Sequence, residues 1–128
     1  MCAPLALNAC GQNLQPPFQV GVCFIDSGGG RYRPLDDGIE NSETCGARLE
    51  VVYLDTHRPV VGAYGGMYVM VDRASIDEQA PNGPKAPLIG PRDRRQIDAD
   101  IRMLQEAQAK DMAREAGPEV NRDRSEDR

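Results

Sequence analysis

The sequence predicts an α+β protein: a small, mostly antiparallel β module of about four or five strands, a proline-rich linker and one C-terminal α-helix. Three observations support this class. Apolar and polar residues alternate in short runs before residue 76, prolines recur between residues 77 and 92, and a helical pattern begins at residue 93. We therefore divide the chain into an irregular cysteine-containing arm (1–17), a β module (18–76), a linker (77–92), a helix (93–117) and a charged tail (118–128).

Composition limits both the size of the core and the classes of partner. The 128 residues include no Trp and two Phe, so few large side chains are present to anchor the packing. A module of this size usually depends on disulfides, metals or partners for its stability. The net charge of −5 argues against nucleic-acid binding, which requires clustered Lys and Arg, and no apolar run is long enough to span a bilayer.

The first strands are predicted from alternation. Residues 18–25 place apolar side chains at every second position, which is typical of a half-buried strand, and the glycine-rich run at 26–30 ends it. Residues 31–35 are expected to form a short edge strand, because Pro34 has no N–H to donate to a sheet. Residues 36–44 are expected to be a polar loop.

The second half of the module continues this pattern. Residues 47–54 alternate and predict a strand that closes in a hairpin turn at 55–59. Two more strands are expected at 60–64 and 66–71. Between them, Gly65-Gly66 predicts a bulge, a kink or a close approach of two backbones.

The C-terminal region is predicted to be a spacer followed by a helix. Prolines and glycines in residues 77–92 favour an extended linker with polyproline character. Asp93 is the expected N-cap, and Gly117-Pro118 is a helix stop signal. The narrow apolar stripe is typical of a helix that binds a partner, although packing on the chain's own β module is an equally open alternative. The stripe has Gln108 in a gap and consists of Ile97, Ile101, Leu104 and Met112.

Four cysteines lie within the first 45 residues, and three interpretations remain open. Two disulfides would staple the arm to the first strand and loop in an oxidising environment. A four-cysteine zinc or iron–sulfur site is the second interpretation, although no Cys-x-x-Cys spacing is present. In the third, Cys23 is a buried strand residue and the other thiols are unpaired or partly paired. The residues concerned are Cys2, Cys10, Cys23 and Cys45.

Catalytic and cofactor-binding patterns are weak, and we predict no catalytic residue and no cofactor. The single histidine, His57, would have to serve any Ser/His/Asp or Cys/His mechanism, yet it lies in a predicted turn. The Gly28-Gly29-Gly30 run is followed by neither Lys-Ser/Thr nor a helix, so a turn is expected rather than a phosphate loop. An acidic loop does not match EF-hand spacing and is expected to be solvated; it contains Asp36, Asp37, Glu40 and Glu43.

A possible lipid anchor depends on Cys10. Leu7-Asn8-Ala9-Cys10 resembles a bacterial lipoprotein cleavage box, but no basic residue precedes it and Pro4 interrupts the short apolar segment before it. We expect no membrane association unless Cys10 is lipidated.

The function expected from these features is structural. A small module with an arm, a linker and a helix is typical of a non-enzymatic accessory subunit that contacts neighbouring proteins in a homo- or hetero-oligomeric assembly, such as the capsid-decoration or tail components of a virus (phage) particle. One alternative is a secreted or lipid-anchored, disulfide-stapled module of a bacterial envelope. Another is a small four-cysteine metal-binding protein.

Overall fold

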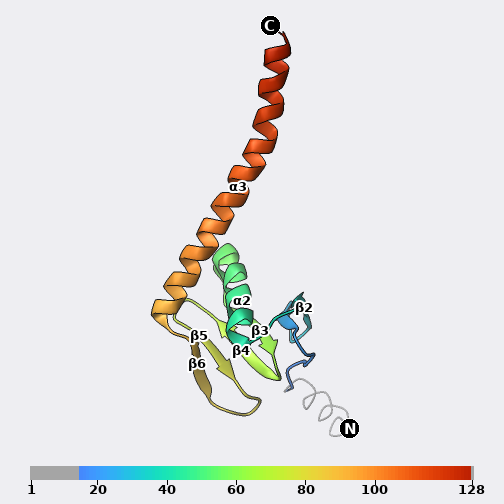
Figure 1. Cartoon of the computed structure of the whole chain (residues 1–128). Helices are drawn as coiled ribbons and strands as arrows, with labels where there is room; N and C mark the ends of the chain where they lie inside the picture. Colours follow the sequence, from blue (N-terminus) through green and yellow to red (C-terminus); the bar gives the residue numbers. More distant parts are fainter. Residues whose placement is uncertain (1–14, 128) are drawn as a thin grey trace. The chain divides into compact units, whose positions relative to one another are not determined.

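The computed structural model describes the backbone of residues 15–127 and the side chains of residues 15–115. The chain divides into two compact units, Met1–Arg94 and Arg95–Arg128. The first contains a six-stranded antiparallel sheet and helix α2 (Ser42–Thr56), and the second contains most of helix α3 (Pro91–Asp127) (Figure 1). The predicted α+β class is confirmed, with slightly more strands than expected.

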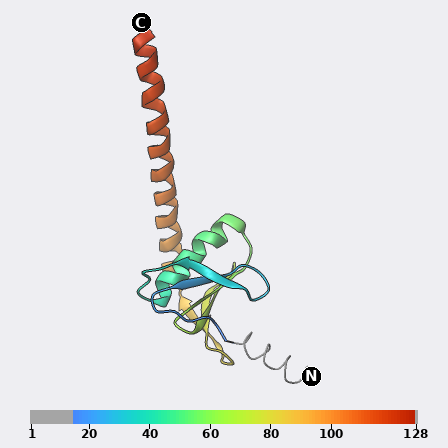
Figure 2. The same ribbon diagram turned by 90° about the vertical axis from the view of Figure 1, so that its right-hand side faces the viewer.

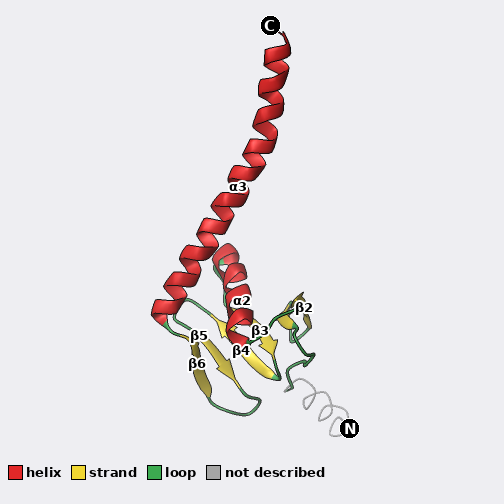
Figure 3. Cartoon of the chain, viewed as in Figure 1, coloured by secondary structure: helices red, strands yellow, loops and turns green. Residues whose placement is uncertain are grey.

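Neighbouring strands of the sheet (yellow in Figure 3) follow one another in the chain, except that β1 lies beside β3. Its spatial order is β2-β1-β3-β4-β5-β6, and each neighbouring pair is antiparallel. The two edge strands each contain a proline, Pro34 in β2 and Pro87 in β6, in keeping with the edge position predicted for residues 31–35. The strands are β1 (Cys23–Asp26), β2 (Tyr32–Asp36), β3 (Val60–Tyr64), β4 (Met67–Val71), β5 (Ile76–Gln79) and β6 (Lys85–Ile89).

The β3–β4 hairpin is the part of the fold that the sequence predicts best. Both strands were expected within a residue of their observed bounds, and Tyr64 pairs with Met67 across a two-residue connection. Gly65 and Gly66 have φ values of 63° and 81°. Positive φ at both central positions is what the favoured two-residue hairpin turns require, so the glycines form the turn itself rather than a bulge within a strand.

The strand predicted at 47–54 is wrong, because these residues form the middle of α2. Asn41 caps this helix: its side-chain oxygen accepts a hydrogen bond from the Thr44 N–H at 2.8 Å. The buried positions of α2 recur at helical spacing, which the alternation of Val and Leu had obscured. They are Cys45, Gly46, Leu49 and Glu50. The predicted polar loop therefore ends at residue 41, and the expected hairpin turn at 55–59 is instead the end of a helix.

The first predicted strand is also too long. Strand β1 begins at Cys23, and Phe18 and Val20 are 65% and 84% exposed rather than half-buried. A turn precedes the strand, since the Val22 N–H donates to the Gln19 carbonyl at 3.1 Å and Gly21 has a φ of 75°. That turn breaks the apparent alternation.

The segment predicted to be a linker forms the β5–β6 hairpin. Its prolines are compatible with a sheet because Pro87 lies on an edge strand and Pro81 and Pro84 lie in the connecting loop. In that loop Asn82 has a φ of 61°, and the Gly83 N–H donates to the Ala80 carbonyl at 2.9 Å. The Pro81-Asn82-Gly83 run is a turn signal between two strands.

Helix α3 is longer at both ends than predicted. It begins at Pro91, a favourable first helical residue, and the Arg94 N–H donates to the Gly90 carbonyl at 2.9 Å, so Asp93 lies in the first turn instead of capping it. The helix continues through Gly117-Pro118 to Asp127, which contradicts both the predicted stop and the separate tail. Ala, Glu and Arg flank the pair, and these residues are strong helix formers.

The core of the first unit lies between α2 and one face of the sheet (Figure 2). Leu49 is fully buried above Gly62, where a Cβ atom would lie 2.6 Å from the Leu49 Cδ1 atom. A second, smaller cluster occupies the other face, since strand side chains alternate between faces. It consists of Val22, Phe24 and Ala63, with Tyr32 packed against it.

Candidate interaction face and its surroundings

Two of the four cysteines form a buried disulfide. Cys23 in β1 and Cys45 in α2 are bonded, and both side chains are 0% exposed. The bond supports a disulfide role for these two cysteines, but it differs from the predicted staple, because it joins β1 to α2 and leaves neither cysteine to pair with the arm. It also removes both thiolates from a four-cysteine metal site in this form. Cys2 and Cys10 lie outside the described residues. Within residues 15–115, no group of three or more His, Cys, Asp or Glu side chains is arranged to hold a metal ion.

A buried ion pair joins α2 to the first turn of α3 within the first unit. Arg94 donates two hydrogen bonds to the Glu50 carboxylate, Nε to Oε2 and Nη2 to Oε1, both at 2.9 Å. The Glu50 side chain is 0% exposed and that of Arg94 is 13% exposed. The guanidinium carbon also lies 5.3 Å from the centre of the Tyr53 ring, a cation–π distance. A bidentate, stacked arginine is geometrically specific, so this cluster fixes the start of α3.

The sequence gives no direct sign of this anchor. Glu50 lies in the strand predicted at 47–54, and Arg94 lies at the start of the helix predicted at 93–117. The recoverable signal is the helical spacing of Cys45, Leu49 and Tyr53, which would have placed Glu50 beside the buried face of α2.

The predicted partner-binding face lies along α3 and differs in exposure along its length. Ile97 is half-buried and Ile101 is 9% exposed, whereas Leu104 and Met112 are 64% and 70% exposed. Every residue from 102 to 115 is exposed. Leu104, Gln108 and Met112 follow at intervals of four residues, so they share one side of the helix. We call these three residues the exposed stripe.

A groove of the first unit has a volume of about 600 Å³, and three of the polar side chains that line it are hydrogen-bonded to the local backbone. The Ser27 and Thr56 hydroxyls donate to the carbonyls of Arg31 and Val52, and the Asp26 carboxylate accepts from the N–H groups of Gly28 and Gly30. The Gly28-Gly29-Gly30 run is therefore a turn, as predicted. Two of its N–H donors already bind a carboxylate rather than facing an incoming phosphate.

His57 ends helix α2. It adopts a left-handed conformation (φ 58°, ψ 28°), and its N–H donates to the Tyr53 carbonyl at 2.7 Å. Its ring meets the Tyr53 ring edge-on, with centres 6.3 Å apart. This is the geometry of a helix C-cap, and it gives His57 a conformational role.

The acidic loop divides between two elements. Asp36 belongs to β2 and its carboxylate pairs with the Arg48 Nε at 2.8 Å, while Glu43 lies in the first turn of α2, where a negative charge is favourable. Asp37 and Glu40 are exposed.

Tyr32 and Asp72 have clearly shifted pKa values. Burial, reinforced by Asp26 and Tyr68, raises the pKa of Tyr32 to about 12. Hydrogen bonds from the Ser75 and Ala74 N–H groups lower the pKa of Asp72, which caps the turn between β4 and β5. Both shifts have local structural causes.

Comparisons with known proteins give no functional assignment: no protein family, curated protein or solved structure matches this chain. No helix within the described part of the chain is long and apolar enough to cross a membrane. The interpretation of function therefore depends on the chain's own geometry.

Proposed function

We propose that this chain is a non-enzymatic interaction protein, an accessory subunit of a larger assembly such as a virus particle, in which α3 contacts a neighbouring protein. The observation that carries the proposal is the uninterrupted exposure of residues 102–115, which include Leu104 and Met112. In proteins, an α-helix gains most of its stability by packing its apolar face against other elements. A helix that extends without such packing in the single chain is suited to acquire it from a partner.

Features of the first unit agree with this proposal. Three polar side chains of the 600 Å³ groove are hydrogen-bonded to the local backbone, and His57 caps a helix. The ion pair of Arg94 with Glu50 holds the first turn of α3 in place. Preorganising the start of a binding element lowers the ordering cost of association.

Site-specific photocrosslinking in the native source tests the proposal. A photoreactive amino acid replaces Leu104 in one variant and Ala86, an exposed residue of β6, in a control variant. We expect a discrete crosslinked species from position 104 that is absent from position 86, together with protection of α3 from limited proteolysis in the isolated assembly. Equal crosslinking at both positions, or α3 cleaved as readily in native extracts as in the purified chain, would contradict the proposal.

A second candidate function is favoured by the Cys23–Cys45 bond. Disulfides form and persist in oxidising compartments, so the chain also fits a secreted or lipid-anchored module of a bacterial envelope. Intact-mass measurement of protein from the native source decides this candidate. An acylated Cys10, or recovery from the envelope fraction with the bond intact, supports it. A chain recovered from the cytosol with reduced Cys23 and Cys45 contradicts it.

A further inference from the structure

We propose that the exposed stripe of α3 binds a protein surface whose apolar seam is bordered by Lys or Arg side chains. This inference rests on the proposed function and specifies the chemistry of the partner. It begins from the exposure of Leu104 and Met112 and from the distribution of charge around them.

Charges are segregated around this part of the helix. Successive helical residues are rotated by about 100°, which places Asp100 and Asp111 along one border of the exposed stripe and Glu115 in line with it at its C-terminal end. The other border is uncharged and holds Gln105 and Ala109.

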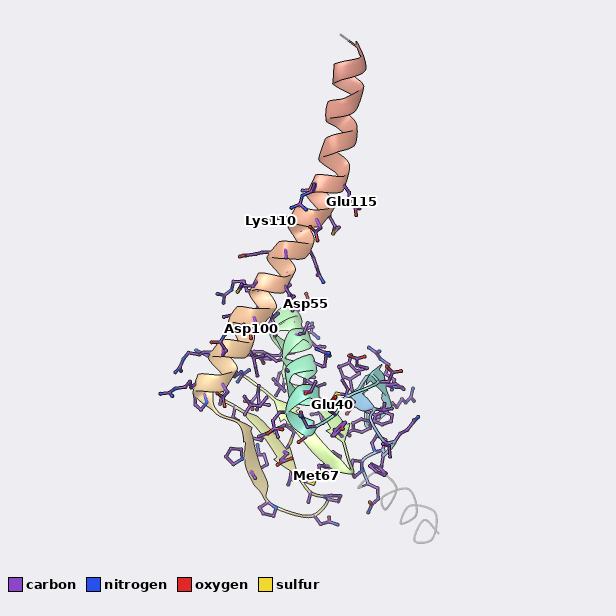
Figure 4. The ribbon with its side chains drawn as sticks, viewed as in Figure 1. Glu40, Asp55, Met67, Asp100, Lys110 and Glu115 are labelled. Atoms are coloured by element: carbon purple, nitrogen blue, oxygen red, sulfur yellow. A yellow bond between two sulfur atoms is a disulfide. The ribbon has the colours of Figure 1, made fainter. Side chains whose placement is uncertain are left out.

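The cations Arg102 and Lys110 lie toward the opposite side of the helix, around Glu106. Figure 4 shows the side chains of Asp100, Lys110 and Glu115 projecting from α3. A partner that covers the stripe therefore meets carboxylates along one border.

Within the described part of α3, Asp100 and Asp111 interact only with solvent-exposed side chains. Asp100 accepts a hydrogen bond from the neutral Gln96 side chain at 3.0 Å. Asp111 pairs with Arg114 at 3.3 Å, but the two side chains are 66% and 73% exposed, so the pair is solvent-screened and weak. The acidic border keeps its attraction for basic side chains.

A second copy of α3 is a poor occupant of the stripe. In a parallel pair, residues at the centre of the seam face their own copies, so the two Glu115 carboxylates would meet. In an antiparallel pair, like borders face each other, so the Asp100 and Asp111 borders would meet. Like charges across an interface disfavour pairing, and two apolar residues offer little area in compensation. A partner with an apolar seam bordered by Lys or Arg would cover the exposed stripe and attract the carboxylates of Asp100, Asp111 and Glu115.

The test uses the full-length chain and two synthetic helical peptides of about three heptads, both with a leucine seam. One carries Lys at the flanking positions and the other carries Glu. We expect the Lys-flanked peptide to bind in fluorescence anisotropy, more weakly as ionic strength rises, and the Glu-flanked peptide not to bind. Replacing both exposed apolar residues, Leu104→Ser with Met112→Ser, should abolish binding while circular dichroism shows an unchanged fold.

A matched pair of variants isolates the acidic border. Asp111→Lys should weaken binding of the Lys-flanked peptide about fivefold, because an attraction becomes a repulsion. Glu106→Lys makes the same change of charge on the opposite side of the helix and should leave binding nearly unchanged. Equal effects of the two variants, or binding of both peptides, would overturn the inference.

Failure of this inference is distinguishable from failure of the proposed function. If light scattering detects a dimer that Leu104→Ser abolishes, α3 is still the contact element, but its partner is a second copy of the chain. That result would overturn the inference of a basic-bordered partner. Absence of crosslinking from position 104 in the native source would remove the proposed function itself.

Discussion

Glu50 is the charged residue with the greatest structural consequence in the first unit. Its carboxylate has no solvent exposure and its two oxygens accept from one guanidinium, that of Arg94. Removing one member of a buried ion pair strands the other, whereas replacing both with apolar groups is often close to neutral. We therefore expect the Glu50–Arg94 pair to fix the position of the first turn of α3 while adding little net free energy relative to an apolar pair.

Glu50→Gln should lower the free energy of unfolding by about 3 kcal/mol, because Arg94 loses its counter-charge in a largely desolvated site. Urea denaturation measures the change. The double variant Glu50→Leu with Arg94→Met should recover most of the loss. Arg48→Ala is the surface control: its pair with Asp36 is half-exposed and should contribute less than about 1 kcal/mol. Equal losses from Glu50→Gln and Arg48→Ala would contradict this assignment.

Gly62 is required by close packing. A Cβ atom at this position would lie 2.5 Å from the Phe24 carbonyl oxygen and 2.6 Å from the Leu49 Cδ1 atom. Gly62→Ala should therefore destabilise the protein by about 2 kcal/mol, as overpacking of a core does. Gly90→Ala is the matched control, since a Cβ there meets no atom within 4 Å. Thermal unfolding of both variants checks the prediction, and a smaller shift for Gly62→Ala than for Gly90→Ala would refute it.

Tyr32 gives the protein an alkaline pH dependence. The pKa of its phenol is raised from 10.0 to about 12, so the native state holds the proton more tightly than the unfolded chain does. This group leaves stability unchanged below pH 10, and stability falls as pH rises from 10 toward 12. Tyr32→Phe should flatten the decline and remove the highest-pH step from the tyrosinate absorbance titration. An unchanged titration in the variant would show that another tyrosine accounts for the step.

Among the elements, β1 and α2 are held together by the Cys23–Cys45 bond, which closes a loop with a sequence separation of 22. Replacing both cysteines by Ala should cost about 3 kcal/mol of unfolding free energy, through the greater freedom of the unfolded chain. Denaturation with and without dithiothreitol measures it: the reductant should shift the wild-type midpoint and leave that of the double variant unchanged. A wild-type midpoint insensitive to full reduction would contradict the expected contribution.

The sequence predicts correctly those elements for which residue pattern and turn residues indicate the same structure. It fails where the same residues fit both a strand and a helix. The β3–β4 hairpin combines alternation with two glycines, and turn chemistry supports the same answer. The alternation of Leu49, Val51 and Tyr53 predicts a strand where helix α2 lies, and the residue that caps this helix, Asn41, falls within the predicted loop. Tertiary packing against the sheet, invisible in a local window, decides that case.

The candidate binding face remains a prediction, although the helix that carries it is observed. The spacing of Ile97, Ile101, Leu104 and Met112 correctly indicated one face of a helix, but not which residues are exposed. The density of prolines and glycines in residues 77–92 predicts a linker rather than the observed β5–β6 hairpin, although edge strands and loops tolerate proline. The Glu50–Arg94 anchor joins residues 44 positions apart, and a single sequence carries no signal for such a pairing.

For the molecule as a whole, the division into two units predicts two levels of local stability. Backbone amides of β3 and β4, at the centre of the sheet, should have the slowest hydrogen exchange, whereas those of residues 102–115 should exchange through local fraying of an exposed helix. Exchange followed by mass spectrometry checks this in the purified chain. Equal protection in both regions would show that α3 is packed in solution, and slower exchange on adding the native assembly would locate the contact.

The prolines on the two edge strands affect whether copies of this protein can pair through their sheet edges. An unpaired edge strand can hydrogen-bond to a strand of another molecule, and repeated addition of strands leads to fibrous aggregates. With Pro34 on one edge and Pro87 on the other, each border withholds an amide donor that an added strand would need. Each edge is therefore a poorer template for an added strand, which disfavours backbone pairing between copies of the protein.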